Sequence, residues 1–360
     1  MDLHEKALEA LLRPAGSGLY LVSTGRALVE AFQARFYGAQ KEEEVLEAHR
    51  SALRRVGKAR IAMIGLPSDA GAGFRRGANL GPLGLREALL EMPDWQDFVE
   101  AHGIVDVGDI FVVPQFLSEA MLSDAQQEAS RRALYGDPLA PWPVAPLEMA
   151  EVVIRALLEI NPTLRILALG GDHSLSWPVV STLIPRHNSI GILHIDAHTD
   201  LLSERLGVRI CFATWAYHAN ELLGRGGRLV QVGIRASRYA REHWEKTLGV
   251  RQMWAKEFLA DPQKGIETLI AWLKEAGIKR LYISNDIDGT DALWADATGT
   301  PEPHGLWPEH VEALIRHAGE AFEIVGGDLV EVAPPLSASK TTTETGARYL
   351  RAMLEVMARC

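Results

Sequence analysis

Three apolar segments of the sequence each end in acidic and histidine side chains, and this repeated ending constrains the fold more than any other feature. The central segment spans residues 191–200 and reads GILHIDAHTD. Residues 166–173 and 280–288 have the same design, an apolar run followed by Asp or His. In an open parallel α/β sheet, the carboxyl ends of the strands line the ligand-binding crevice. We therefore expect the three endings to meet at one site.

The polar residues at these endings are of the types that bind metal ions. Asp196, His198 and Asp200 alternate along the chain, so an extended backbone would point all three to one face. Carboxylates buried together repel one another unless a cation neutralises them. Solvated charges at an exposed strand end are the alternative interpretation, but three coincident endings favour a metal site.

The number of candidate ligands predicts two metal ions rather than one. The three endings supply two imidazoles and four carboxylates, namely His173, Asp196, His198, Asp200, Asp286 and Asp288. This set is too large for one tetrahedral ion, and its four negative charges match two divalent cations held roughly 3.5–4 Å apart. Mixed imidazole and carboxylate ligation suits Mn²⁺, with Ni²⁺, Fe²⁺ or Zn²⁺ as alternatives. Such a pair lowers the pKa of a bridging water, which predicts hydrolysis of a polar carbon or phosphorus centre.

The overall composition excludes several classes of function. The net charge of −10 argues against a nucleic-acid partner, and no stretch approaches the roughly 20 apolar residues of a membrane span. Two cysteines, Cys211 and Cys360, cannot build a disulfide framework. The charged N-terminus does not read as a secretory signal. We therefore expect a cytoplasmic protein that binds a small molecule and no membrane.

Two regions differ in their pattern. Residues 1–57 read as charged helices and are predicted to form an N-terminal helical extension that packs on the main body or on a neighbouring subunit. Residues 58–360 alternate strands with helices, which predicts one α/β domain with a mainly parallel sheet. Residues 117–147 contain closely spaced prolines and are predicted to be irregular.

The ligand motifs resemble those of a known family. GGDHS at 170–174, DAHTD at 196–200 and NDIDGTD at 285–291 resemble the three metal motifs of the arginase/agmatinase ureohydrolases. Residues 65–88, 105–109, 298–303 and 328–335 also match agmatinase-like members, so the resemblance covers roughly residues 60–357. It implies a three-layer αβα fold around a mainly parallel, eight-stranded sheet, a binuclear manganese site and a homo-oligomer, a trimer or hexamer.

The resemblance also implies roles for the ligands. Asp196 and Asp286 would bridge the two ions, His173 and Asp200 would complete one, and His198 and Asp288 the other. Asp200 would in addition orient the attacking hydroxide, which makes it a catalytic candidate. The hydroxide would attack a guanidinium carbon and release urea and an amine. Glu331, on a late strand, would lie near the metals.

The sequence departs from the family pattern around the substrate. Aligning through Thr214 places Phe212 where arginases and agmatinases carry a proton-shuttling histidine, and His218 nearby is the candidate replacement. His310 stands where many members carry a glutamate that faces the guanidinium. We therefore predict His218 as a second catalytic residue, and Phe212, Thr214, His310 and Glu331 as substrate-binding residues.

Three functions are compatible with these departures. The first is hydrolysis of a guanidino or related amidino compound by a manganese-dependent ureohydrolase. The second is formimidoyl-type hydrolysis, because members of that branch also lack the shuttle histidine. The third is a metal-binding family member without turnover. Retention of all six ligands favours an active enzyme, since a protein without catalysis has little chemical reason to keep six ionisable groups that need two cations.

Overall fold

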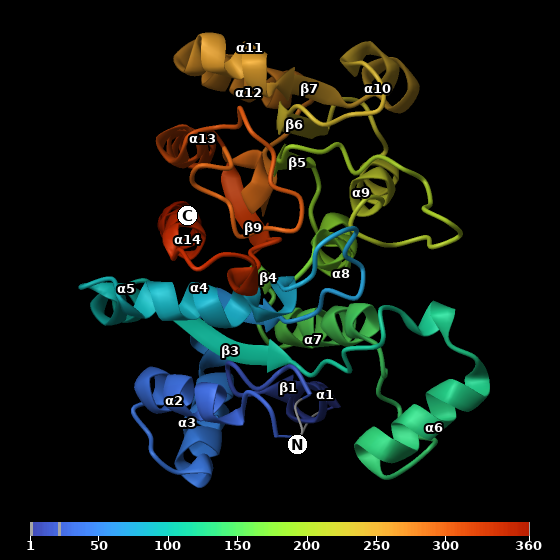
Figure 1. Cartoon of the computed structure of the whole chain (residues 1–360), viewed down its shortest axis with the longest axis vertical. Helices are drawn as coiled ribbons and strands as arrows, with labels where there is room; N and C mark the ends of the chain where they lie inside the picture. Colours follow the sequence, from blue (N-terminus) through green and yellow to red (C-terminus); the bar gives the residue numbers. More distant parts are fainter. Residues whose placement is uncertain (1–2, 21–22, 360) are drawn as a thin grey trace.

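The computed structural model describes residues 3–20 and 23–359, and a twisted sheet runs through its centre (Figure 1). Within the described residues the sheet has nine strands in the order β1-β3-β2-β4-β9-β8-β5-β6-β7. The strands are β1 (Leu12–Arg13), β2 (Ile61–Leu66), β3 (Ile104–Ile110), β4 (Arg165–Gly170), β5 (Ile190–Ile195), β6 (Leu229–Ile234), β7 (Arg251–Trp254), β8 (Arg280–Asp286) and β9 (Glu323–Val330). Interior strands such as β2 and β5 are buried along their whole length because helices cover both faces of the sheet.

Every pairing in the sheet is parallel except that of β1 with β3. The three-layer fold and the mainly parallel sheet are therefore confirmed. The expected number of eight strands is corrected to nine for the described residues, because Leu12–Arg13 adds a short antiparallel strand at one edge. Two residues are too few for any hydrophobic periodicity to reveal a strand.

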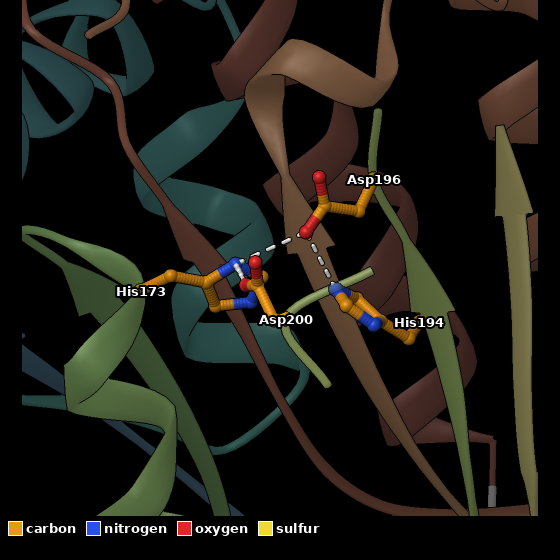
Figure 2. Close-up of side chains that lie close together, drawn as sticks. All are labelled: His173, His194, Asp196 and Asp200. Atoms are coloured by element: carbon orange, nitrogen blue, oxygen red, sulfur yellow. Dashed lines mark hydrogen bonds and ion pairs between the residues drawn. The ribbon is translucent and has the colours of Figure 1, made fainter. Parts of the chain in front are cut away.

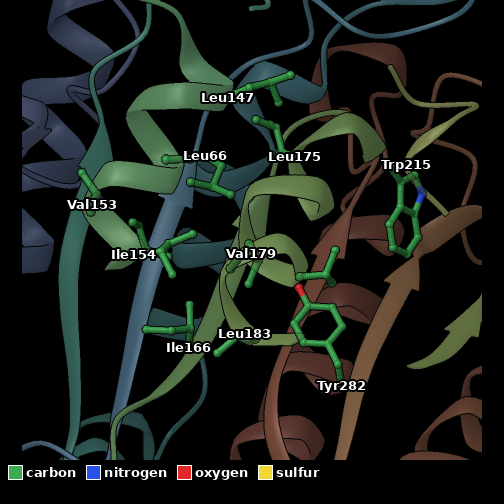
Figure 3. Close-up of a cluster of buried hydrophobic side chains, with 14 of the residues drawn as sticks. Leu66, Leu147, Val153, Ile154, Ile166, Leu175, Val179, Leu183, Trp215 and Tyr282 are labelled. Carbon is green, nitrogen blue, oxygen red and sulfur yellow. The ribbon is translucent and has the colours of Figure 1, made fainter. Parts of the chain in front are cut away.

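The helices form the two outer layers. One layer holds α1 (Leu3–Leu11), α7 (Pro146–Ile160), α8 (Ser176–Leu183) and α9 (Trp215–Leu223). The opposite layer holds α4 (Gly81–Leu90), α12 (Pro262–Glu275), α13 (Pro308–Ala321) and α14 (Thr341–Ala358). The remaining helices are α2 (Arg26–Tyr37), α3 (Glu42–Arg55), α5 (Trp95–Ala101), α6 (Asp124–Tyr135), α10 (Arg241–Leu248) and α11 (Ala255–Ala260). Figure 3 shows the first core, in which Val153 and Val179 from α7 and α8 meet strand residues such as Ile166.

The N-terminal region packs against this body. Helix α1 packs on α7, and α3 lies against β3. A buried ion network underlies the contact, because the Arg86 guanidinium binds Asp106 in a bidentate manner and also binds Asp109. The second oxygen of Asp109 accepts a hydrogen bond of 2.7 Å from the Gly16 amide. The fully buried charge of Arg86 is thus matched by two carboxylates, one of which, Asp109, also holds the N-terminal segment.

Residues 117–147 are not irregular throughout, which corrects the expectation from the sequence. Helix α6 (Asp124–Tyr135) lies in this region and projects from the body (Figure 1). It begins with a capping box, in which Ser123 and Gln126 each accept a hydrogen bond from the other's backbone amide, and ends at Gly136 in the left-handed region. The closely spaced prolines begin only after this helix. None of the helices in the described part of the chain is long and apolar enough to cross a membrane.

Candidate metal centre

Four neighbouring strands bring the candidate residues together at one edge of the sheet. His173 follows β4, Glu331 follows β9, Asp286 ends β8 and Asp196 follows β5, in the order in which these strands lie in the sheet. The turn after β4 requires glycine, because a Cβ on Gly171 would lie 1.7 Å from a backbone oxygen. The parallel topology therefore places ligand-type side chains from separate segments around one volume, as the sequence predicted.

The predicted ligands form two adjoining groups that share Asp196. In the first, His173 Nδ1 lies 3.3 Å from Asp196 Oδ2 and 3.1 Å from an oxygen of both Asp200 and Asp286. Figure 2 shows His173, Asp196 and Asp200 converging. In the second group, His198 Nδ1 lies 3.1 Å from Asp288 Oδ2 and 3.5 Å from Asp196 Oδ1.

The two groups share Asp196 through its two separate carboxylate oxygens. Asp196 turns Oδ2 toward His173 and Oδ1 toward His198, so one carboxylate serves both groups. Two sets of side chains have the atom spacing needed to hold a metal ion. The first is His173, Asp196 and Asp200 together with the neighbouring His194, and the second is Asp196, His198 and Asp288.

The hydrogen bonds behind His173 fit it for a cation. The Ser284 hydroxyl donates to Asp328 at 2.8 Å, so its oxygen accepts from His173 Nε2 at 3.0 Å. In the neutral imidazole, a proton on Nε2 leaves Nδ1 with a lone pair, and this buried atom has no hydrogen-bond partner within the described residues. A histidine whose outer nitrogen is held in this way is the usual arrangement at a protein metal site.

The electrostatics of the site show an excess of buried negative charge. Burial, together with the neighbouring Asp288 and Asp196, raises the pKa of Asp286 well above its usual range. Burial and Asp196 also raise the pKa of Asp200. Burial lowers the pKa of His198, but Asp288 and Asp196 outweigh it and raise that pKa to about 12. Both kinds of shift follow from carboxylates that need a neutralising cation, and the donor set of imidazoles and carboxylates fits a divalent metal.

A tryptophan outside the predicted ligand set supports this centre directly. Trp215 is fully buried and donates its indole N–H to Asp200 Oδ2 at 3.0 Å. Its ring lies 4.6 Å from the His173 ring. Asp200 itself has a backbone φ of 52°, which an aspartate can adopt when side-chain contacts compensate for the strain. The spacing of Trp215 from Asp200 gave no signal of this contact.

The loop between β8 and α13 closes the side of the second group. Thr300 donates its hydroxyl to Asp288 Oδ2 at 2.8 Å. Glu302 places a carboxylate oxygen 3.8 Å from His198 Nε2, on the partly exposed side of the imidazole. Neither residue is predicted from the sequence to have a role in the site, although both lie in the 298–303 segment that resembles the family.

The predicted substrate residues divide between the rim of the site and its supports. Phe212 is half-buried beneath the Arg205 guanidinium, at 4.7 Å from the ring centre, and its amide donates to Gly71. Thr214 is fully buried, and its hydroxyl accepts from the Cys211 amide at 2.8 Å, so it shapes the turn before α9. Glu331 accepts a hydrogen bond of 2.9 Å from the His173 amide, which places it beneath the ligand.

The two predicted histidines outside the ligand set have other contacts. His218 Nε2 lies 3.0 and 3.1 Å from the carbonyl oxygens of Ser203 and Arg209, so this nitrogen donates to the loop before α9. The ring of His310 packs against Trp307 and Phe258. Among the described residues, neither histidine has a hydrogen bond or ion pair to the six ligands. Their roles in proton transfer and substrate binding stay predictions.

The fold and site together define an α/β protein with metal-type ligands at the carboxyl ends of parallel strands, and comparison with known proteins gives the family. The model of the arginase family matches residues 59–355. A guanidinobutyrase from Pseudomonas aeruginosa is 31% identical over 305 residues, which cover 82% of this chain and 86% of that protein. A mitochondrial agmatinase from Gallus gallus is 31% identical over 308 residues, covering 82% and 80% of the two chains.

A solved structure shows the same relationship. The proclavaminate amidino hydrolase from Streptomyces clavuligerus superimposes with a TM-score of 0.68 at 27% identity, covering 84% of this chain and 92% of that one. The chain therefore belongs to the arginase family, in the agmatinase-like branch of the ureohydrolases. The resemblance read from the three motifs is confirmed.

Proposed function

We propose that this protein hydrolyses a carbon–nitrogen bond of a small guanidino compound and releases urea and an amine. The observation that carries the proposal is the position of Asp196, whose two oxygens face two separate groups of ligand-type residues. Relatives named guanidinobutyrase and agmatinase support the reaction class. The six side chains predicted from the sequence would hold two divalent cations, for which Mn²⁺ suits the mixed imidazole and carboxylate donors.

The chain's own residues would divide the remaining work. A pair of divalent cations supplies a nucleophile at neutral pH by lowering the pKa of water. Asp200, fixed by the Trp215 indole, would accept a hydrogen bond from that water and orient it. Glu302, partly exposed beside His198, offers a carboxylate that can pair with a guanidinium group. Many family members carry a guanidinium-facing glutamate at the position of His310, and the Glu302 carboxylate would take its place. The His310 ring instead packs against Trp307 and Phe258.

Formimidoyl-type hydrolysis is the second candidate, and one observation favours it. Phe212 stands where related enzymes carry a shuttle histidine, and its ring packs against Gly73, where a Cβ would lie 2.1 Å from the ring. A phenylalanine cannot transfer a proton to a leaving amine. The candidate His218 uses Nε2 to hold the preceding loop.

The test is product release by the metal-loaded protein. The protein would be loaded with Mn²⁺ and assayed for urea from arginine, agmatine, guanidinobutyrate, guanidinopropionate, guanidinoacetate and guanidine. We expect urea from at least one substrate and its loss in Asp286→Ala with folding unchanged. Undiminished hydrolysis by that variant would refute the mechanism. Formamide release from a formimidoyl substrate, with no urea, would select the second candidate, and no product from either panel would indicate a non-catalytic protein.

A further inference from the structure

Three polar side chains form a row across the buried sheet behind the proposed metal centre. His194 on β5, Gln231 on β6 and Gln252 on β7 are register partners on adjacent strands. Each has no exposed surface. Gln252 Nε2 donates to Gln231 Oε1 at 2.7 Å, Gln231 Nε2 lies 2.8 Å from His194 Nδ1, and His194 Nε2 lies 2.7 Å from Asp196 Oδ2. The row is a continuous chain of hydrogen bonds from an edge strand to Asp196.

Groups that can only donate or only accept fix the direction of this chain. The Gln231 Nε2 atom also lies 2.7 Å from the carbonyl oxygen of Thr199, which can only accept, so this end of the amide is the NH₂ group. The indole N–H of Trp254 can only donate, and it lies 3.2 Å from Gln252 Oε1. Gln252 must therefore donate to Gln231 through Nε2. The two anchors define the orientation of both amides.

The orientation of Gln231 decides which nitrogen of His194 carries a proton. Because Gln231 donates to it, Nδ1 of His194 is an acceptor, and Nε2 is the atom that donates to Asp196. Both ring nitrogens are then engaged. His194 lies within ligand distance of His173, Asp196 and Asp200, yet neither of its nitrogens is free to bind a metal ion. Figure 2 shows the His194 ring directed at the Asp196 carboxylate.

We propose that the Gln252–Gln231–His194 row is a positioning chain that sets the rotation of the Asp196 carboxylate. The hydrogen bond from His194 engages Oδ2, the oxygen that faces His173, and leaves Oδ1 directed at His198. A carboxylate shared by two ligand groups must present one oxygen to each group. Free rotation about its Cβ–Cγ bond would turn both oxygens away from these groups. This inference rests on the proposed metal centre, and assigns His194 as a positioning residue rather than a ligand.

The test uses Co²⁺ as the probe ion and compares three variants of the full chain. Gln231→Met keeps the length of the side chain but removes its three hydrogen bonds, to His194, Thr199 and Gln252, so His194 loses its fixed orientation. We expect its Co²⁺ affinity to fall about 10- to 100-fold, as for other residues that orient ligands, and the visible Co²⁺ spectrum to change. Gln252→Met leaves the Gln231 contacts to His194 and Thr199 in place, so its affinity should fall less.

Gln33→Met is the matched control. Gln33 is also buried and donates Nε2 to a backbone carbonyl and a side-chain oxygen, but it lies on α2. We expect a similar loss of thermal stability with unchanged Co²⁺ affinity and spectrum. Equal affinity and spectrum in Gln231→Met and the wild type would overturn the proposal.

A second measurement keeps the proposal testable if Gln231→Met does not fold. The ¹⁵N resonances of the His194 ring in the Zn²⁺-loaded wild type report which nitrogen carries the proton. A proton on Nε2 supports the positioning chain, and a proton on Nδ1 overturns it. A wild type that binds no Co²⁺ would refute the metal centre itself and the chain with it. Normal Co²⁺ binding without urea release would refute only the reaction, so the two failures are distinguishable.

Discussion

Replacing Trp215 with phenylalanine would test the support of Asp200 without altering any proposed ligand. The indole N–H donates to Asp200 Oδ2 at 3.0 Å, and that oxygen also lies 3.1 Å from His173 Nδ1. Phenylalanine keeps an aromatic ring beside the His173 imidazole but has no donor. The Asp200 carboxylate would then be free to turn away from His173.

The magnitude follows from the type of hydrogen bond. A hydrogen bond to a charged group contributes about 1.5–3 kcal/mol. Since each 1.4 kcal/mol is tenfold in an equilibrium constant, the affinity for Mn²⁺ should fall roughly 10- to 150-fold. The loss should appear in the ion bound by the group that contains His173 and Asp200, because Trp215 has no hydrogen bond to the His198 group among the described residues.

The assay is competition between the protein and a chelator of known Mn²⁺ affinity, with thermal unfolding measured in parallel. Trp244→Phe is the matched control, because Trp244 is also buried and donates its indole N–H at 3.0 Å, but to Ser237, which is not one of the proposed ligands. Both variants should lose some stability, and only Trp215→Phe should lose metal affinity. Equal Mn²⁺ affinity in the two variants would refute the reasoning.

Three further results are expected. Glu302→Gln should raise the KM for a guanidino substrate about tenfold or more with Mn²⁺ content unchanged, because the carboxylate that would pair with the guanidinium is lost beside His198. An unchanged KM would exclude Glu302 from substrate binding. Arg86→Met should lower the free energy of unfolding by about 3–5 kcal/mol, since it leaves buried carboxylates unpaired, and denaturant unfolding would show it. Burial raises the pKa of Asp172 to about 6, and carboxylates raise that of His198 to about 12, so both groups bind protons more tightly in the folded state. The metal-free protein should therefore lose stability as the pH rises from 5 to 8, while the stabilisation by added Mn²⁺ should grow; a rise in metal-free stability over this range would contradict these shifts.

Much of the ligand set could be predicted because strand spacing is a strong local signal. Asp196, His198 and Asp200 alternate directly after an apolar run, and the same ending recurs at His173 and at Asp286. Parallel strands present their carboxyl ends at one edge, so these endings had to meet once the sheet was recognised. The structure brings together all six residues predicted from these endings.

The roles of the surrounding residues could not be predicted in the same way. Trp215 contacts Asp200 only because the intervening loop folds back and α9 begins there. His218 lies one turn further along the same helix, and its ring is directed at the loop carbonyls. Phe212 and His310 mark where the sequence departs from the family motifs, but the sequence does not show what either side chain contacts. Those contacts depend on long-range packing, which has no periodicity in the sequence.

The sequence by itself determined the class of fold, the edge of the sheet that carries the site and the chemical type of its donors, because all three follow from local patterns of apolar and ligand-type residues. The tertiary structure decided that Asp196 directs one oxygen to His173 and the other to His198. It also decided that His194, the register partner of Gln231, lies beside Asp196. These features depend on which strands are neighbours and on their register. Strand order and register are fixed by packing across the whole sheet rather than by any one segment.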